Sequence, residues 1–202
     1  LPAGTALKNK GIVDFHDSMR LDYECARINE ILGTALFQPR IQDCHPLFWS
    51  AITEVLINLR DLCWFADKAQ ARLAWSDDLS PNTLCKDVTD LITFCRDGLC
   101  HSHTYHKYID RDTEMVGIKN IVTGKNDPDL PGMRIGGIEL RCEYDNEVAL
   151  FIGKERLYLK RHIVRAFHEL VRIFVQKGLL EAEVWRSQPR LPVAGPPQNT
   201  TE

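Results

Sequence analysis

The sequence lacks any apolar segment long enough to cross a bilayer. A membrane-spanning helix needs about 18 consecutive apolar residues, and no run in this chain approaches that length. The first residues, LPAGTALKNKG, lack the apolar core of a secretory signal. The seven cysteines are odd in number and fall mostly on the apolar faces of expected helices, unlike a disulfide framework. We therefore expect a cytoplasmic protein that does not associate with a membrane.

Motifs of several common enzyme classes are also missing. The sequence contains no P-loop, no GxGxxG, no internal repeat and no serine in a nucleophile-elbow pattern. The formal net charge is −3, which argues against a protein that coats nucleic acid through bulk positive charge. The 25 lysines and arginines still allow local contacts with phosphate groups.

Helical periodicity is the main pattern that the sequence does contain. With 202 residues, of which 44% are hydrophobic and 26% charged, the chain is long enough for one domain with a real core. Apolar residues recur at helical spacing over 17–37 and from about 46 to 73. Ser80 and Pro81 are typical of the first turn of a helix and predict a third, strongly amphipathic one. A last helix follows further along the chain, and Gly178 is expected to end it.

Between the third and the last helix the period changes from helical to alternating. In GIELRCEYD, apolar and charged residues alternate over 138–144, which predicts a half-buried strand. Tight turns at 145–146 and 153–154 lead into EVALFI and RLYL, so we expect an antiparallel meander. The polar segment 110–132 contains glycines and prolines and is expected to be mainly loop.

These patterns together predict a mainly α fold. We expect an up-down helical bundle with a small antiparallel β meander before the last helix. Residues 1–186 would form a single domain, with the β insertion at about 133–159. The tail 187–202 holds four prolines and ends in QNTTE, so it is expected to be disordered.

The segment FCRDGLCHSHTYH, residues 94–106, is the part of the chain densest in reactive side chains. Its permitted zinc ligands are Cys95, Cys100, His101, His103 and His106. The spacing argues against a zinc site, because there is no CxxC. Cys95 also falls within the apolar stripe of the third helix, where a free cysteine usually behaves as a small hydrophobe. We therefore expect no metal and no cofactor.

A second hypothesis for this segment is catalysis by Arg96, Asp97 and His101. On a continuous helix, Arg96 and His101 would point about 140° apart. They converge only if the helix ends near Cys100 and His101 turns back, or if two copies of the helix meet across a dimer axis. Arginine suits a phosphate group, and histidine transfers protons near neutral pH. On RNA the nucleophile is the substrate's own 2′-hydroxyl, so neither a protein nucleophile nor a metal is required.

The string CRDGLCH resembles the R-x4-6-H motif of the HEPN superfamily, in which a polar residue typically follows the arginine. The resemblance implies a metal-independent endoribonuclease that works as a homodimer with a composite site. By that analogy His101 is the general acid/base, Arg96 stabilises charge on the phosphate and Asp97 orients the site. The products would be a 2′,3′-cyclic phosphate and a 5′-hydroxyl. Such domains occur in toxin–antitoxin and defence systems, so an antitoxin or a regulatory protein is an implied partner.

Two alternatives remain open from the sequence. Some members of the superfamily bind a nucleotide or a protein partner without cleaving, and this chain is compatible with such a non-catalytic dimer. A helix C-terminus also favours basic residues without any catalytic purpose. The residues that follow the motif are candidates for contacts with the RNA or are simply solvated surface; they are His103, Tyr105, His106 and Lys107.

Two further groups are candidate supports for the site. Three polar residues lie one turn apart on the second helix: Glu54, Asn58 and Asp61. They could contact Arg96 and support its position, or could simply face solvent. The segment KRHIVRAFH, residues 160–168, places several basic residues near an apolar stripe. It could follow a phosphate backbone, although a solvated helix face explains it more simply.

Overall fold

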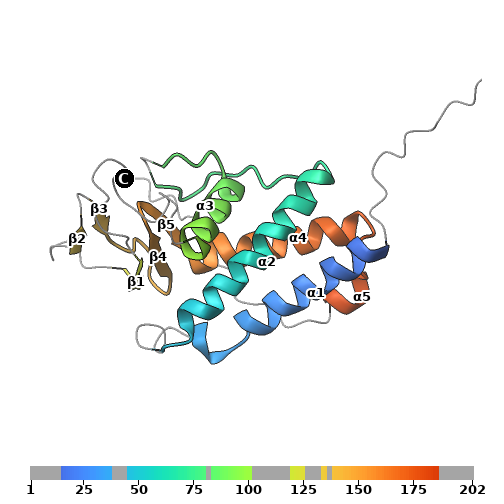
Figure 1. Ribbon diagram of the computed structural model, residues 1–202, viewed down its shortest axis with the longest axis horizontal. Coiled ribbons are helices and arrows are strands. Elements are labelled where there is room, and N and C mark those ends of the chain that lie inside the picture. Colours follow the sequence, from blue (N-terminus) through green and yellow to red (C-terminus); the bar gives the residue numbers. More distant parts are fainter. Residues whose placement is uncertain are drawn as a thin grey trace, which may run out of the picture.

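Four helices of at least twelve residues occur in the part of the chain that the structure describes. This computed structural model describes residues 15–37, 45–80, 83–101, 119–125, 133–135 and 138–186 (Figure 1). The long helices are α1 (Phe15–Leu32), α2 (Phe48–Lys68), α3 (Val88–Cys100) and α4 (Arg165–Gln176). Shorter helical segments are η1 (Ala35–Phe37), the π-helix η3 (Leu159–Val164) and α5 (Ala182–Arg186). No helix in these ranges combines the length and apolar character that crossing a membrane requires.

Helix α2 occupies the centre of the helical part. It packs against α1, α3 and α4, and Figure 1 shows it lying between α3 and α1. Its buried side chains recur at three- and four-residue steps, as the sequence predicts, and they are Phe48, Ile52, Val55, Leu56, Leu59, Leu62, Cys63, Phe65 and Ala66. The helix ends at Lys68 rather than near residue 73, because Gln70 adopts a left-handed conformation with φ of 56°.

Five strands, arranged in two antiparallel sheets, occur among the described residues. β1 (Lys119–Thr123), β4 (Val148–Ile152) and β5 (Glu155–Tyr158) form a sheet in the order β1-β4-β5. β2 (Met133–Ile135) and β3 (Ile138–Leu140) form a separate pair beyond it (Figure 1). Every residue of β4 is buried, and α3 packs against β4 and β5.

The prediction of a mainly α up-down bundle is therefore wrong, because the described chain is a mixed α/β fold. The sheet is part of the main core: Val148, Leu150 and Leu157 belong to the same buried cluster as the helices. The expected meander also differs in its order. The strand expected over 138–144 is confined to β3, which pairs with β2, whereas β4 lies between β1 and β5. β1 lies in the segment 110–132 that was expected to be loop.

Helix α3 begins later than Ser80 and Pro81 suggest. Its first residue is Val88, and the Asp87 carboxylate caps it by accepting the backbone N–H of Asp90 at 2.9 Å. Arg72, just beyond α2, holds the same carboxylate with two hydrogen bonds of 2.8 and 3.0 Å. Leu84 precedes the helix and is 65% exposed. The ion pair with Arg72 thus fixes where α3 begins.

Candidate functional site

The end of α3 determines how the residues of the R-x4-6-H-like motif meet. The helix ends at Cys100, and His101 takes an extended conformation with φ of −113° and ψ of 108°. Its backbone N–H still donates to the backbone oxygen of Asp97 at 3.0 Å. His101 therefore makes the last helical hydrogen bond, although its own backbone is already extended. This is the first of the two arrangements under which Arg96 and His101 could converge.

The structure brings Arg96, Asp97 and His101 together within one chain. Arg96 Nη1 lies 3.2 Å from His101 Nε2 and donates to Asp97 Oδ1 at 2.7 Å. His101 Nε2 and Asp97 Oδ1 are 4.0 Å apart. A guanidinium group can only donate, so Nε2 of His101 is the acceptor and the imidazole proton is on Nδ1. In that tautomer the lone pair of Nε2 is directed at the arginine.

The three side chains differ in exposure in a way that suits a binding site. The His101 side chain is 54% exposed, whereas those of Arg96 and Asp97 are 19% and 26% exposed. Arg96 Nε is buried and has no hydrogen-bond partner, so the base of the guanidinium is embedded while its Nη1 end reaches the histidine. A solvent-exposed imidazole beside an anchored guanidinium is accessible to a ligand.

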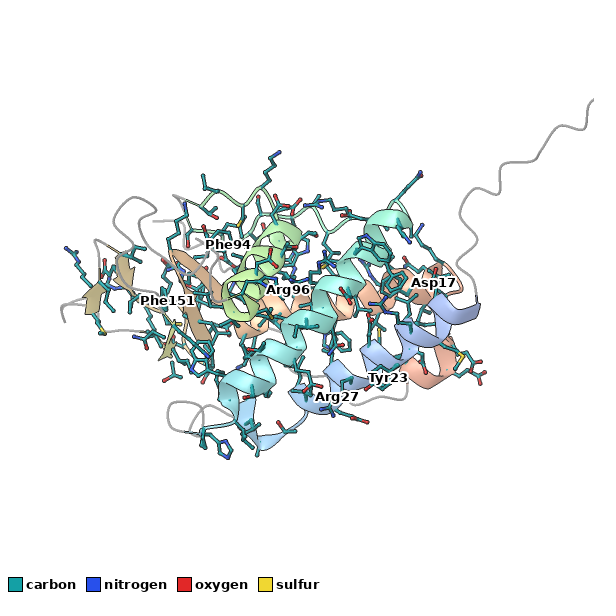
Figure 2. All side chains as sticks on the ribbon, viewed as in Figure 1. Asp17, Tyr23, Arg27, Phe94, Arg96 and Phe151 are labelled. Atoms are coloured by element: carbon teal, nitrogen blue, oxygen red, sulfur yellow. The ribbon has the colours of Figure 1, made fainter. Side chains whose placement is uncertain are left out.

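Arg96 faces the side of α3 that lies next to α2. Thr89 occupies nearly the same angular position two turns earlier, and its hydroxyl donates to the backbone oxygen of Leu73, just beyond α2. Thr89 also lies within hydrogen-bonding reach of Cys63 in α2. Figure 2 shows Arg96 in the corresponding position, between α3 and α2. The motif therefore lies on the side of α3 that faces α2.

The two cysteines of the motif have different environments. Cys95 is fully buried, and burial raises the pKa of its thiol well above the usual range. Cys100 is exposed, yet partial burial raises its pKa and the Asp97 charge adds to this, while Arg96 opposes it. A raised pKa disfavours the thiolate that a nucleophilic cysteine requires. Within the described ranges, no group of three or more His, Cys, Asp or Glu side chains could hold a metal ion.

Several candidates from the sequence are not brought to this site. His103, Tyr105, His106 and Lys107 lie outside the described residues, as does the tail 187–202. The hypothesis that α2 supports Arg96 is not met, because its polar residues face α1 instead. Glu54 pairs with Arg27 at 2.6 Å, Asp61 pairs with Arg20 at 2.5 Å, and Asn58 donates to the backbone oxygen of Glu54.

Basic residues of η3 and of the first turn of α4 are engaged in internal contacts. Arg161 pairs with Asp78 at 3.1 Å, and Arg165 pairs with Asp77 at 2.8 Å. Tyr144 donates to Asp78 at 2.5 Å, and burial raises the pKa of Tyr144 to about 12. These contacts attach the segment 71–80 to the start of α4. The sequence gives little indication of them, because the partners are separated by 66 to 88 residues.

Comparison with known proteins does not extend the resemblance. No protein-family model matches the chain, and no curated protein and no solved structure is significantly similar to it. The resemblance to the HEPN motif therefore rests on the residues from Cys95 to His101. What the structure adds is the contact between the arginine and the histidine of that motif.

Proposed function

We propose that this protein is a metal-independent endoribonuclease that cleaves RNA by attack of the substrate's 2′-hydroxyl. The observation that carries the proposal is the 3.2 Å contact between Arg96 Nη1 and His101 Nε2 at the exposed end of α3. The guanidinium group, which suits a phosphate, lies beside an exposed imidazole whose Nε2 faces it. These are the two groups that this reaction needs from a protein.

The contact also suggests how substrate binding activates the histidine. A phosphate oxygen is a stronger acceptor for a guanidinium N–H than a neutral imidazole is. When a phosphate oxygen accepts the hydrogen bond from Arg96 Nη1, that N–H no longer donates to His101. The lone pair on His101 Nε2 then becomes free. That nitrogen then accepts the 2′-hydroxyl proton as the 2′-oxygen attacks phosphorus.

Bond breaking completes the reaction. The bond from phosphorus to the 5′-oxygen breaks, and the imidazolium returns its proton to that oxygen. The products are a 2′,3′-cyclic phosphate and a 5′-hydroxyl. Arg96 neutralises the extra negative charge that develops on the phosphate in the transition state. Asp97, which accepts a hydrogen bond from Arg96 at 2.7 Å, keeps the guanidinium in place.

The proposal includes a homodimer and a protein regulator, as the resemblance implies. Arg96 and His101 already touch within one chain, so a second copy is not needed to complete the pair. We propose that it enlarges the RNA-binding surface. An antitoxin or another regulatory protein would act by covering the exposed His101.

The test is RNA cleavage in the presence of EDTA. We expect the wild-type protein to cut structured RNA and to leave 2′,3′-cyclic phosphate ends, identified by end-group analysis. His101→Ala and Arg96→Ala should each lower the rate by at least about a hundredfold, the usual contribution of a general acid/base or of charge stabilisation. Arg96→Lys should recover part of the loss, because it restores charge without the fork.

Arg172→Ala is the matched control, because Arg172 is an exposed residue of α4 outside the motif. It should cut like the wild type. Undiminished cutting by both motif variants, or dependence on a divalent cation, would contradict the proposal. A wild-type protein that cuts no RNA in a broad panel would favour the non-catalytic dimer that binds a nucleotide or a protein partner.

A further inference from the structure

The outer face of helices α1 and α2 carries four exposed apolar side chains. Met19 and Tyr23 on α1 are 58% and 69% exposed, and Ile57 and Trp64 on α2 are 41% and 42% exposed. The two helices pack side by side, and α4 packs on both of them. We call this surface the α1–α2 face. Large apolar side chains gathered on one face commonly mark a protein interface.

Charged residues of opposite sign lie on the same face. On α1, Arg20 and Arg27 are seven residues apart and so point the same way two turns apart. On α2, Asp61 and Glu54 have the same spacing. The two rows touch, since Arg20 pairs with Asp61 and Arg27 pairs with Glu54, at 2.5 and 2.6 Å. At these two levels the α1–α2 face therefore has arginines on α1 opposite carboxylates on α2. Glu24 and Glu30 on α1 and Arg60 on α2 add charge of the opposite sign beside them.

These ion pairs fix the relative heights of the two antiparallel helices. Arg20 is level with Asp61, and Arg27 is level with Glu54. Tyr23 lies between the two arginines and is therefore level with Ile57, which lies between the two acids. The α1–α2 face thus alternates along the helices between charged levels and an apolar level.

We propose that the α1–α2 face binds a second copy of this chain about a two-fold axis parallel to α1 and α2. Such a rotation keeps every residue at its own height and exchanges the two sides. The α1 helix of one copy then lies over α2 of the other. Arg27 faces the partner's Glu54, and Arg20 faces the partner's Asp61. Tyr23 packs on the partner's Ile57 between these two charged levels.

The charges favour this axis over the other two-fold arrangement. An axis perpendicular to the helices would place α1 over the partner's α1, and the arginine rows would repel each other. With the parallel axis, each charged level becomes a ring of four charges that alternate in sign. Complementary charge of this kind selects the register and the partner.

The size of the face is sufficient for a dimer of modest affinity. Helices of 18 and 21 residues are about 27 and 31 Å long, and two of them side by side are about 20 Å wide. Each copy then buries about 500 Å², or about 1,000 Å² in total, which is near the lower bound for a specific interface. Because attraction between opposite charges contributes to the binding of the two copies, we expect the dimer to weaken with added salt.

This inference rests on the homodimer of the proposed function and states which surface forms it. Helix α3 flanks α2 on the side away from α1 (Figure 1). A copy seated on the α1–α2 face would therefore leave each Arg96–His101 pair open in its own chain. The dimer would have two independent sites, rather than one cleft shared on the axis.

The experiment compares oligomeric states of the full chain by sedimentation equilibrium from about 1 to 100 μM. Wild type should dimerise. Arg27→Glu alone places four acids in one ring, and Glu54→Arg alone places four arginines there, so each variant should raise the dimer Kd by roughly a hundredfold. In an equal mixture of the two variants, each acid of one chain faces an arginine of the other, so the contacts between chains are attractive again. That mixture should therefore dimerise nearly as well as wild type.

Exposed ion pairs contribute little to folding, so both variants should keep the wild-type far-UV circular dichroism spectrum. A variant that unfolds is replaced by Tyr23→Glu or Ile57→Glu, which must also give monomers. A monomeric wild type, single variants that still dimerise, or a mixture that stays monomeric would each overturn the proposal. RNA cleavage is measured separately. A monomeric protein that cleaves RNA would refute only the proposed interface, and a dimer that does not cleave RNA would refute only the proposed nuclease activity.

Discussion

His162 should make the stability of this protein depend on pH between about 4 and 6.5. The side chain lies in η3 and is fully buried. Its Nδ1 accepts the backbone N–H of Tyr158 at 3.0 Å. Its Nε2 lies 3.1 Å from the backbone oxygen of Asp77, and since a carbonyl only accepts, Nε2 carries the proton. Protonating Nδ1 would point its N–H at the backbone N–H of Tyr158, and two donors cannot form a hydrogen bond. The fold therefore requires the neutral imidazole.

Burial lowers the pKa of His162 from 6.5 to about 4. The folded protein therefore binds this proton less readily than the unfolded chain does. The contribution of His162 to stability is complete above pH 6.5 and is lost as the pH falls through the folded pKa. A shift of this size corresponds to about 3 kcal/mol in total, with a limiting slope of about 1.4 kcal/mol per pH unit.

Urea unfolding of wild type and His162→Asn at pH 7.5, 6.5, 5.5 and 4.5 measures this contribution. The asparagine oxygen can take the place of Nδ1 and accept from Tyr158, but it does not titrate in this range. We expect the variant to be less stable at pH 7.5 and to lose less free energy of unfolding as the pH falls. Carboxylates titrate in both proteins, so the difference between them isolates His162. Equal pH slopes would refute this account.

Two further predictions concern buried carboxylates that hold helix starts. Glu147 accepts three backbone N–H groups, those of Val148, Lys160 and Arg161, at 2.8 to 3.1 Å. Glu147→Gln points an amide N–H at one of these donors, so it should lower the free energy of unfolding in urea by about 1–3 kcal/mol. The control is Glu181→Gln at an exposed site, which should change it by no more than about 0.5 kcal/mol. Asp87→Ala removes the α3 cap and the Arg72 ion pair and should cost about 2 kcal/mol. Asp87→Asn keeps an acceptor for the cap and should cost clearly less; equal losses for the two would contradict the capping role.

The convergence of Arg96 and His101 was predictable as one of two alternatives because it depends on local structure. The residues are five apart, and the only question was whether the helix continued past Cys100. Gly98 in the last turn weakens the helix but does not fix where it ends. The structure ends the helix at Cys100 and so selects the arrangement within one chain.

The mixed α/β fold was not predictable from the same patterns. The segment KNIVT becomes β1 because it pairs with β4, whose paired residues follow 25 to 33 positions later. Its own burial pattern does not alternate, so the two-residue period that identifies a half-buried strand is missing. The alternating run 138–144 shows the opposite error, since only its first three residues form a strand. Strand pairing depends on partners distant in sequence, and local periodicity does not specify them.

The same distinction applies to the candidate site. The contact of Arg96 with His101 is local, but the position of α3 depends on distant partners. Arg72 holds Asp87 at the start of the helix, and β5 packs against the helix from the sheet. A local motif of this kind is easily found in unrelated sequences. In this protein, however, the helix that carries the motif is fixed at one end by an ion pair and leaves His101 exposed at the other.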